Sequence, residues 1–254
     1  MNEPVLSKIK VNDIEMAVFE WHSELRGKSP TVVLAHATGF HARCWDQVIG
    51  HLDPCHIIAV DQRGHGRSQS TKLESWHVFG DDLVALMHAM DVSNAIGVGH
   101  SMGGHAMVQA ASKDSTLFSQ LLLIDPVIMP PERYANPSDA MIGSPEDHPT
   151  SRRRSQFNSV EDMVQRFAER EPYSIFQPAA FHDYCEYGLL ADAESDDGSL
   201  RLACQPIFEA SVYMTSLSMP EILDMPAKID IPVTILRAML PPAERDIMTF
   251  KYSP

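Results

Sequence analysis

Apolar residues in the chain gather into short runs that alternate with helical patterns. The runs Thr31–His36, Ile57–Asp61, Ala95–Gly99, Leu121–Asp125 and Ile231–Leu236 are nearly continuous in apolar character. Such runs are typical of strands that are buried on both faces. Because strands that alternate with helices build parallel sheets with helices on both faces, the pattern predicts a doubly wound, mostly parallel α/β sheet.

The remaining elements of the first half follow from the same reading. Two strand-like runs, Leu6–Val11 and Ile14–Trp21, predict an antiparallel hairpin with its turn near Asn12 and Asp13. Helical spacing of apolar residues predicts helices over three segments, Ala42–Leu52, Val78–Met90 and Met102–Ser112.

The alternation of strands and helices stops after Asp125. More than a hundred residues separate Asp125 from the next buried run, and this segment reads as loop and helix, with helical patterns at Val160–Glu169 and Ser211–Leu223. We therefore expect a mostly helical insertion over one edge of the sheet. The expected division is a core over residues 1–126, a helical cap over 127–228 and the remainder of the core over 229–254.

One short motif carries the strongest chemical signal. Gly99-His100-Ser101-Met102-Gly103 follows an apolar strand, opens a helix of small residues and fits the pattern Gly-x-Ser-x-Gly. A serine on so sharp a turn needs very small neighbours two residues away, and the turn lifts its hydroxyl to a helix N-terminus. A plain glycine-rich turn is the alternative. A dinucleotide-binding fingerprint fails, because Met102 stands where its third glycine is required.

Three further segments accompany this motif in a fixed order. They are Leu34–Phe40, with the sequence LAHATGF, then Asp61–Ser68, with DQRGHGRS, and Leu122–Pro126, with LLIDP. With these motifs the chain resembles the capped, single-chain branch of the α/β-hydrolase fold family. The resemblance covers about residues 1–126 and resumes more weakly at Ile231–Ala238, which is similar to the seventh strand of that fold.

The resemblance implies a set of site residues. Ser101 is the expected nucleophile, and the backbone N–H groups of Thr38 and Met102 are the expected donors to an oxyanion. Ala37 stands where the family usually has glycine in this loop. The residues expected to line the substrate pocket are His36, Phe40 and His100.

The catalytic acid has two candidates. The family places an Asp or Glu after its sixth or its seventh strand. Asp125 ends the sixth strand, whereas Asp246 comes late after the seventh, and we favour Asp125 over Asp246. An Asp that caps a turn before Pro126 is the structural alternative.

The catalytic base is missing from the expected place. A serine needs a base to take its proton, and the family supplies a histidine after the eighth strand. Only His105, His148 and His182 follow Ser101, and 17 residues follow Arg237, too few for the helix, strand and loop required. We expect a C-terminally truncated core without strand eight and its histidine. A naturally shortened relative that binds without turnover is a second reading, and a base supplied by His148 or His182 is a third.

The resemblance implies hydrolysis of an ester or similar acyl bond of a small molecule, through a covalent intermediate on Ser101. A serine rather than an aspartate at the turn disfavours dehalogenase and epoxide hydrolase chemistry, while carbon–carbon bond hydrolases, thioesterases and cofactor-free peroxidases share the serine. The alternative is a non-catalytic ligand-binding or interaction protein on a hydrolase scaffold. No metal and no cofactor are implied.

Charge and composition narrow the partners. Lys and Arg number 20 against 34 Asp and Glu, so the formal net charge is −14, which argues against a nucleic-acid partner on electrostatic grounds. The N-terminus has no signal-peptide pattern, no apolar run is long enough to span a bilayer, and the four cysteines are scattered. These features predict a cytoplasmic protein with reduced thiols and no membrane partner, and leave the oligomeric state open. Arg152–Arg154 reads as a solvated face, with guidance of an anionic substrate as the alternative.

Overall fold

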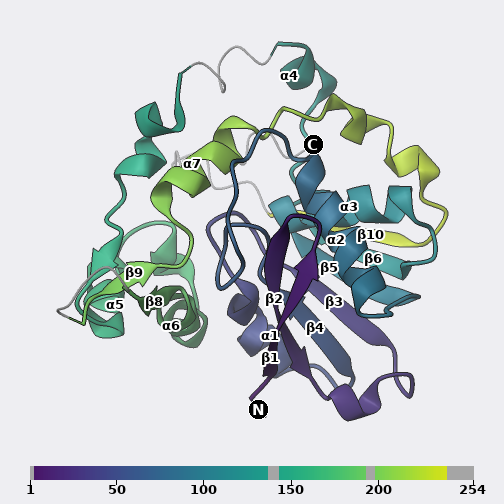
Figure 1. The fold of residues 1–254 in the computed structure, drawn as a ribbon, viewed down its shortest axis with the longest axis horizontal. Helices are drawn as coiled ribbons and strands as arrows, with labels where there is room; N and C mark the ends of the chain where they lie inside the picture. Colours follow the sequence, from purple (N-terminus) through teal and green to yellow (C-terminus); the bar gives the residue numbers. More distant parts are fainter. Residues whose placement is uncertain (1–2, 137–142, 193–197, 239–254) are drawn as a thin grey trace.

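A seven-stranded sheet forms the centre of the molecule (Figure 1). The computed structural model describes residues 3–136, 143–192 and 198–238. The strands run in the spatial order β1-β2-β4-β3-β5-β6-β10. Their bounds are β1 (Val5–Val11), β2 (Ile14–Trp21), β3 (Thr31–Ala35), β4 (His56–Val60), β5 (Ala95–His100), β6 (Phe118–Ile124) and β10 (Val233–Leu236).

Strand direction divides this sheet into two parts. β1 and β2 form the predicted antiparallel hairpin, and β2 also pairs antiparallel with β4. From β4 through β3, β5 and β6 to β10, every pair is parallel. The carboxyl ends of these five strands therefore lie at one edge of the sheet, where open α/β sheets place their sites. The predicted fold class, a mostly parallel doubly wound sheet, is confirmed.

Alternate residues of the central strands are buried on opposite faces. In β3, Val33 and Ala35 belong to the apolar cluster under α2 (His77–Ala89) and α3 (Met102–Lys113). Val32 and Leu34 belong to the cluster on the other face, with Ala42 and Trp45 of the 3-10 turn η2 (Ala42–Trp45), which leads into α1 (Asp46–Ile49). This double burial explains why the strand sequences read as unbroken apolar runs.

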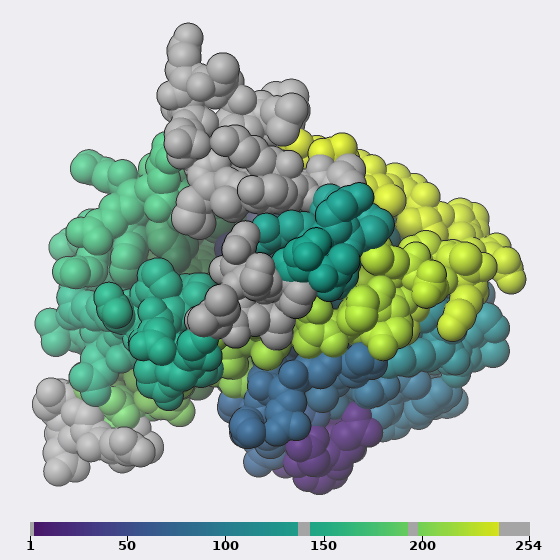
Figure 2. Space-filling model, turned by 90° about the horizontal axis from the view of Figure 1, so that it is seen from above, coloured from purple at the N-terminus to yellow at the C-terminus, as the bar shows by residue number. Residues whose placement is uncertain are grey.

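The segment between β6 and β10 adds no strand to this sheet within the described residues, although its last part, including Val212 and Ile222, packs into the apolar cluster of the core. Its described residues form a second, three-stranded sheet in the order β7-β9-β8, together with four α-helices. Figure 1 shows it as an arch that leaves the sheet after β6, and Figure 2 shows its green residues as a lobe beside the blue and purple core. Its elements are α4 (Pro131–Ala135), β7 (Gln156–Phe157), α5 (Val160–Phe167), α6 (Pro178–Tyr187), β8 (Leu189–Ala191), β9 (Leu200–Leu202) and α7 (Pro206–Met214). We refer to this segment as the insertion.

The structure differs from the sequence-based expectation in the insertion. The three strands of the small sheet are only two or three residues long, too short to produce a recognisable alternation. The helix expected over Ser211–Leu223 begins earlier, at Pro206, because proline suits the first turn of a helix. It ends at Met214, and the rest of the expected segment holds a separate 3-10 turn, η7 (Pro220–Leu223).

Two expectations for the core also need correction. Ala42–Leu52 forms the short η2 and α1 turns instead of one helix, because side chains anchor this segment: Asp61 Oδ1 accepts from Ala42 N at 2.7 Å, and Arg43 pairs with Asp46. The run Ile231–Leu236 was expected to be buried on both faces. β10 pairs only with β6 within the described residues, and its Ile235 is 57% exposed.

Two further observations bear on the chain's surroundings. No helix in the described ranges has the combined length and apolar character that crossing a bilayer requires. The four cysteines, Cys44, Cys55, Cys185 and Cys204, are all free thiols.

Candidate active site

Ser101 sits on a strained turn between β5 and α3. Its φ of 55° and ψ of −114° lie in a region that non-glycine residues rarely adopt. Ser101 N donates to Ile124 O at 2.9 Å, and Ser101 O accepts from Val127 N at 3.2 Å, so the next strand holds both sides of the turn. The serine is half-buried at the carboxyl end of β5.

The two glycines of the motif are explained by backbone contacts. A Cβ on Gly99 would lie 2.5 Å from Gly103 O, and one on Gly103 would lie 2.2 Å from Ala35 O of β3. Both distances are far below van der Waals contact, and neither backbone can retreat without disturbing the sheet. The structure therefore satisfies the steric condition that the sequence pattern predicts for a nucleophile turn.

The loop after β3 lies against the start of α3. Thr38 Oγ1 donates to Met102 Sδ at 3.5 Å, so the side chains of the two residues expected to supply oxyanion donors are in contact. The Met102 N–H belongs to the first turn of α3, whose N–H groups have no acceptor within the helix. Gly39 has a φ of 78°, so it supplies the left-handed turn that this loop requires. A carbonyl oxygen at this position would meet donors and the positive end of a helix.

The structure corrects the expectation for His36. The side chain is 1% exposed, its Nδ1 donates to Ala37 O at 2.8 Å, and its Nε2 accepts from Gln62 N at 3.0 Å. Burial, with His65 nearby, moves the pKa of His36 well below its ordinary value, so the ring is neutral. Because both ring nitrogens are bonded within the protein, His36 supports the loop from below and does not line a pocket.

Phe40 and His100 remain candidates for lining residues. Both are half-buried, and their rings meet edge to face with centroids 6.2 Å apart. Phe40 also contacts Phe176 and Tyr184 of the insertion, at centroid distances of 6.1 and 5.2 Å. Burial lowers the pKa of His100, so this ring too is neutral near pH 7.

Asp125 lies beside Ser101 at the edge of the sheet. β5 and β6 pair with His100 opposite Ile124, so the next residues along the two strands are Ser101 and Asp125. Asp125 N donates to Leu236 O at 2.8 Å, and Asp125 Oδ2 accepts from Ala238 N at 3.3 Å. The end of β10 thus holds this carboxylate in place. The alternative acid, Asp246, lies outside the described residues.

All twelve histidines lie in the described ranges, and none of them forms a hydrogen bond with Ser101 there. His105 is fully buried on the far side of α3, where its Nδ1 bonds Val127 O at 2.8 Å and its ring meets Trp76. His148 stacks on Tyr213 with centroids 5.7 Å apart, and its Nδ1 accepts from Thr150 N. No described histidine therefore stands as the base for Ser101.

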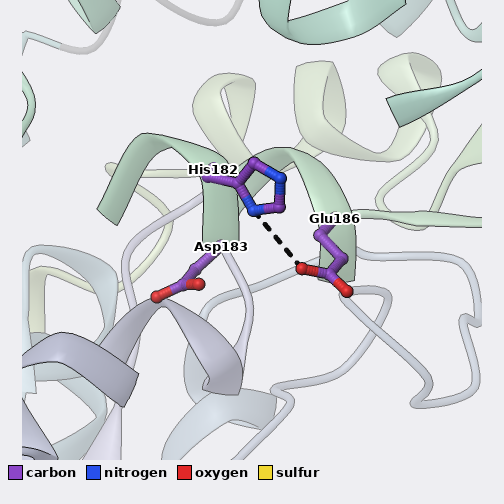
Figure 3. A group of neighbouring side chains, drawn as sticks. All are labelled: His182, Asp183 and Glu186. Carbon is purple, nitrogen blue, oxygen red and sulfur yellow. Dashed lines mark ion pairs between the residues drawn. The ribbon is translucent and has the colours of Figure 1, made fainter. Parts of the chain in front are cut away.

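His182 faces away from the core on α6 (Figure 3). Its Nδ1 pairs with Glu186 Oε2 at 3.3 Å, while Asp183 points elsewhere and accepts from Gln47 Nε2 at 2.7 Å. Ligand atoms of these three residues lie within 4.8 Å of one another. The group is largely exposed and already paired, so we assign no ion to it, and the expectation of no metal stays a prediction.

Sequence reasoning missed a buried ion pair beside the loop after β3, which we refer to as the oxyanion loop because it contains Thr38. Glu209 of α7 is 4% exposed and accepts a hydrogen bond from Arg153 Nη1. The other terminal nitrogen of Arg153, Nη2, donates to the hydroxyls of Tyr173 and Tyr184 at 3.1 and 3.2 Å. A Cβ on Gly39 would lie 2.7 Å from Glu209 Oε1, so the insertion contacts this loop directly. Arg153 is therefore not part of a solvated face. The signal available in the sequence was only the position of Glu209 on the apolar α7.

The comparisons with known proteins agree with this fold. The model of the "Alpha/beta hydrolase family" matches residues 32–246. Lipase LipV of Mycobacterium tuberculosis is 30% identical over 132 residues, which are 51% of each chain. The 2-(acetamidomethylene)succinate hydrolase of Mesorhizobium japonicum is 33% identical over 103 residues, 39% of this chain and 37% of that protein. The chain thus spans about half the length, or less, of these curated relatives.

The solved structures support the fold over nearly the whole chain. A thioesterase domain from the curacin biosynthetic pathway superposes with a TM-score of 0.69 at 18% identity, covering 92% of this chain and 82% of that domain. At such low identity the likeness shows the fold alone. With the match of the family model to most of the chain, the sheet order and the turn at Ser101, it follows that this chain belongs to the α/β-hydrolase family.

Proposed function

We propose that this α/β hydrolase cleaves an ester or similar acyl bond of a small molecule through a covalent intermediate on Ser101. The observation that carries the proposal is the strained turn at Ser101, which the backbone around Gly99 and Gly103 holds against β3. A strained backbone at a half-buried hydroxyl is a frequent mark of a functional site. The lipase and hydrolase names of the relatives favour the same reaction class.

The chemistry assigns one role to each group. Ser101 Oγ attacks the acyl carbon and loses its proton to a base, and the carbonyl oxygen becomes an oxyanion between the N–H groups of Thr38 and Met102. The alcohol leaves with a proton, and water then releases the acid from Ser101. Removing one such N–H donor typically costs about 3 kcal/mol of transition-state stabilisation. We assign the acid to Asp125, which the end of β10 holds beside Ser101.

The insertion is proposed as a cap over this site, with residues 127–228 as its bounds. Its α7 places Glu209 against Gly39, and its Phe176 and Tyr184 contact Phe40. These contacts support a role for the insertion in enclosing the acyl substrate at the oxyanion loop. A cytoplasmic location belongs to the same proposal, supported by four thiols that are all free.

A fluorophosphonate probe tests the nucleophile directly, since it reacts with activated serines. In the presence of free imidazole, which can take the serine proton, we expect labelling of the wild-type chain and none of Ser101→Ala. Ser112→Ala is the matched control, because Ser112 lies on the same helix and bonds only Gln109 O, and it should label like the wild type. A wild-type chain that stays unlabelled even with imidazole present would contradict the proposal and favour a ligand-binding protein on this fold.

The rate of ester hydrolysis, with and without an added base, gives a second test of Ser101. Hydrolysis of p-nitrophenyl acetate should be slow without added base, because no histidine of the described residues bonds Ser101. Free imidazole should increase the rate for the wild-type chain by more than it does for Ser101→Ala, since imidazole can supply the missing proton acceptor. Equal rates for both proteins at every imidazole concentration would remove Ser101 from the reaction.

A further inference from the structure

A pocket with a volume of about 430 Å³ lies at the seam between the core and the insertion, away from Ser101. Its core wall comes from Lys8 of β1 and from the turn that follows β4, including Arg67. Its other wall comes from the β8–β9 hairpin, with Leu190 and Arg201, and from Phe208 of α7. We refer to it as the seam pocket.

The charge of the seam pocket is opposite to that of the chain. Lys8, Arg67 and Arg201 line it, and no Asp or Glu is among its lining residues in the described part of the chain. The whole chain, in contrast, has a formal net charge of −14. Three cations gathered without a carboxylate raise the local positive potential, because low-dielectric walls focus the field of the charges that line a cleft.

The three cations of the seam pocket form few ion pairs with the described residues around them. Lys8 pairs with Glu15 at 3.3 Å, but both side chains are about half exposed, and such surface pairs are weak. Within the described ranges neither Arg67 nor Arg201 forms an ion pair. Arg67 Nη1 donates to Tyr187 O at 3.4 Å, which carries no full charge. The buried Asp61 carboxylate behind the turn attracts Arg67, but its oxygens accept from the backbone N–H groups of Ala42 and Arg67, so it does not occupy the donors of the guanidinium.

The local backbone structure shapes both walls of the pocket. The antiparallel pairing of β8 with β9 sets Leu190 opposite Arg201, so both side chains stand on one face of the hairpin. On the core side, Gly64 and Gly66 have positive φ angles, and a Cβ on Gly64 would lie 2.1 Å from the ring of Phe208. The missing side chain lets Phe208 close the back of the pocket, so the cavity depends on both units.

We propose that the seam pocket binds a small molecule that carries a phosphate or carboxylate group. The guanidinium groups of Arg67 and Arg201 present planar donors that suit oxyanions, and Lys8 adds a point charge at the rim. Leu190 and Phe208 offer apolar surface to the rest of the molecule. A bound anion bridges the two arginines, one from each unit, and so stabilises the insertion against the core.

Calorimetric titration with inorganic pyrophosphate and with citrate tests this proposal and distinguishes the two anions. We expect at least one of them to bind, with an affinity that falls as salt increases. Arg201→Gln should weaken that binding about tenfold or more, because it removes a charged donor. Arg166→Gln is the matched control: it removes the same charge from an exposed site on α5, outside the pocket, and should bind like the wild type.

A second variant protects the test against misfolding. Lys8→Gln changes an exposed side chain on the opposite wall and should also weaken binding, by less than Arg201→Gln. Each titration is repeated with Ser101→Ala, where anion binding should persist, so that failure of the proposed hydrolase activity cannot be mistaken for failure of this site. No binding of either anion, or equal losses in Arg201→Gln and Arg166→Gln, would overturn the proposal.

Discussion

The two halves of the candidate site are held in different ways. On the side of Ser101, the glycines at 99 and 103 press against backbone atoms of the sheet and of α3 itself. On the side of the oxyanion loop, Gly39 presses against the carboxylate tip of Glu209, a side chain from the insertion. Backbone within a parallel sheet cannot yield, whereas a side chain can adopt another rotamer. The core therefore fixes the proposed nucleophile, while the insertion can adjust the loop that we propose receives the substrate oxygen.

The largest expected effect comes from acid and tests the core together with its contacts to the insertion, because His41 bonds Tyr184 O and His65 contacts Phe208. Burial lowers the pKa of His41, His65 and His105 to about 4. A group whose pKa is depressed in the folded state contributes stability above its unfolded pKa of about 6.5 and loses it as the pH falls toward 4. From pH 6.5 to 5.0 each histidine should lower the free energy of unfolding by about 2 kcal/mol. Burial raises the pKa of Asp61 to about 6, and this carboxyl group offsets part of the loss.

Urea unfolding at pH 7.0 and 5.0 measures the result. The free energy of unfolding should fall by about 4 kcal/mol, because three histidines outweigh one carboxylate. Equal stability at both values would show that the buried rings are not held neutral.

Gly103→Ala should produce the next largest effect and tests the contact with β3. Its Cβ would lie 2.2 Å from Ala35 O, so we expect a loss of about 3 kcal/mol or a failure to fold. Gly50→Ala is the matched control, because Gly50 is exposed with an ordinary φ of −61° and should tolerate alanine. Thermal unfolding that shows similar losses for both variants would contradict the comparison.

Glu209→Gln tests the insertion half and should cost less. It leaves Arg153 without its carboxylate, but Arg153 is 25% exposed and keeps two tyrosine hydroxyls, so we expect a loss of about 1–2 kcal/mol. The double variant with Arg153→Met should recover part of this loss in a double-mutant cycle of urea unfolding. A loss from Glu209→Gln as large as that from Gly103→Ala would mean that the insertion is as rigidly built as the core.

The smallest effect is expected at the edge of the sheet. Ile235 and Leu123 are directly paired across β10 and β6, but Ile235 is 57% exposed and Leu123 is 2% exposed. Ile235→Thr should change the free energy of unfolding by less than about 0.5 kcal/mol, whereas Leu123→Thr should cost about 2 kcal/mol or more. Similar losses at the two positions would show that β10 is buried as the sequence suggested.

Sequence reasoning predicted the core well because its rules are local. Strands buried on both faces leave continuous apolar runs, and the glycines around Ser101 report a steric demand within a few residues. The same reasoning placed β10 in the interior, because an apolar run does not reveal whether a strand has one neighbour or two. Burial depends on strand order, which a single run of residues does not encode.

The insertion was harder to predict, because its contacts are distant in sequence. Strands of two or three residues, such as β7 and β9, leave no measurable alternation. Arg153 pairs with Glu209 across 56 positions, and each residue alone resembles an ordinary surface charge. His36 was expected in the pocket because its motif is close to the site, but the motif did not reveal the two hydrogen bonds that hold the ring below the loop.

The strained turn at Ser101 also separates what can vary from what cannot. The side chain at 101 is half-buried at the carboxyl end of β5, whereas its glycine neighbours have no room for a single methyl group. An exchange of residue 101 for cysteine or aspartate would therefore alter the nucleophile without repacking the sheet, while the glycines are fixed by geometry whatever reaction the fold performs. Evolution on this scaffold can thus change its chemistry at one side chain and leave the architecture that presents it untouched.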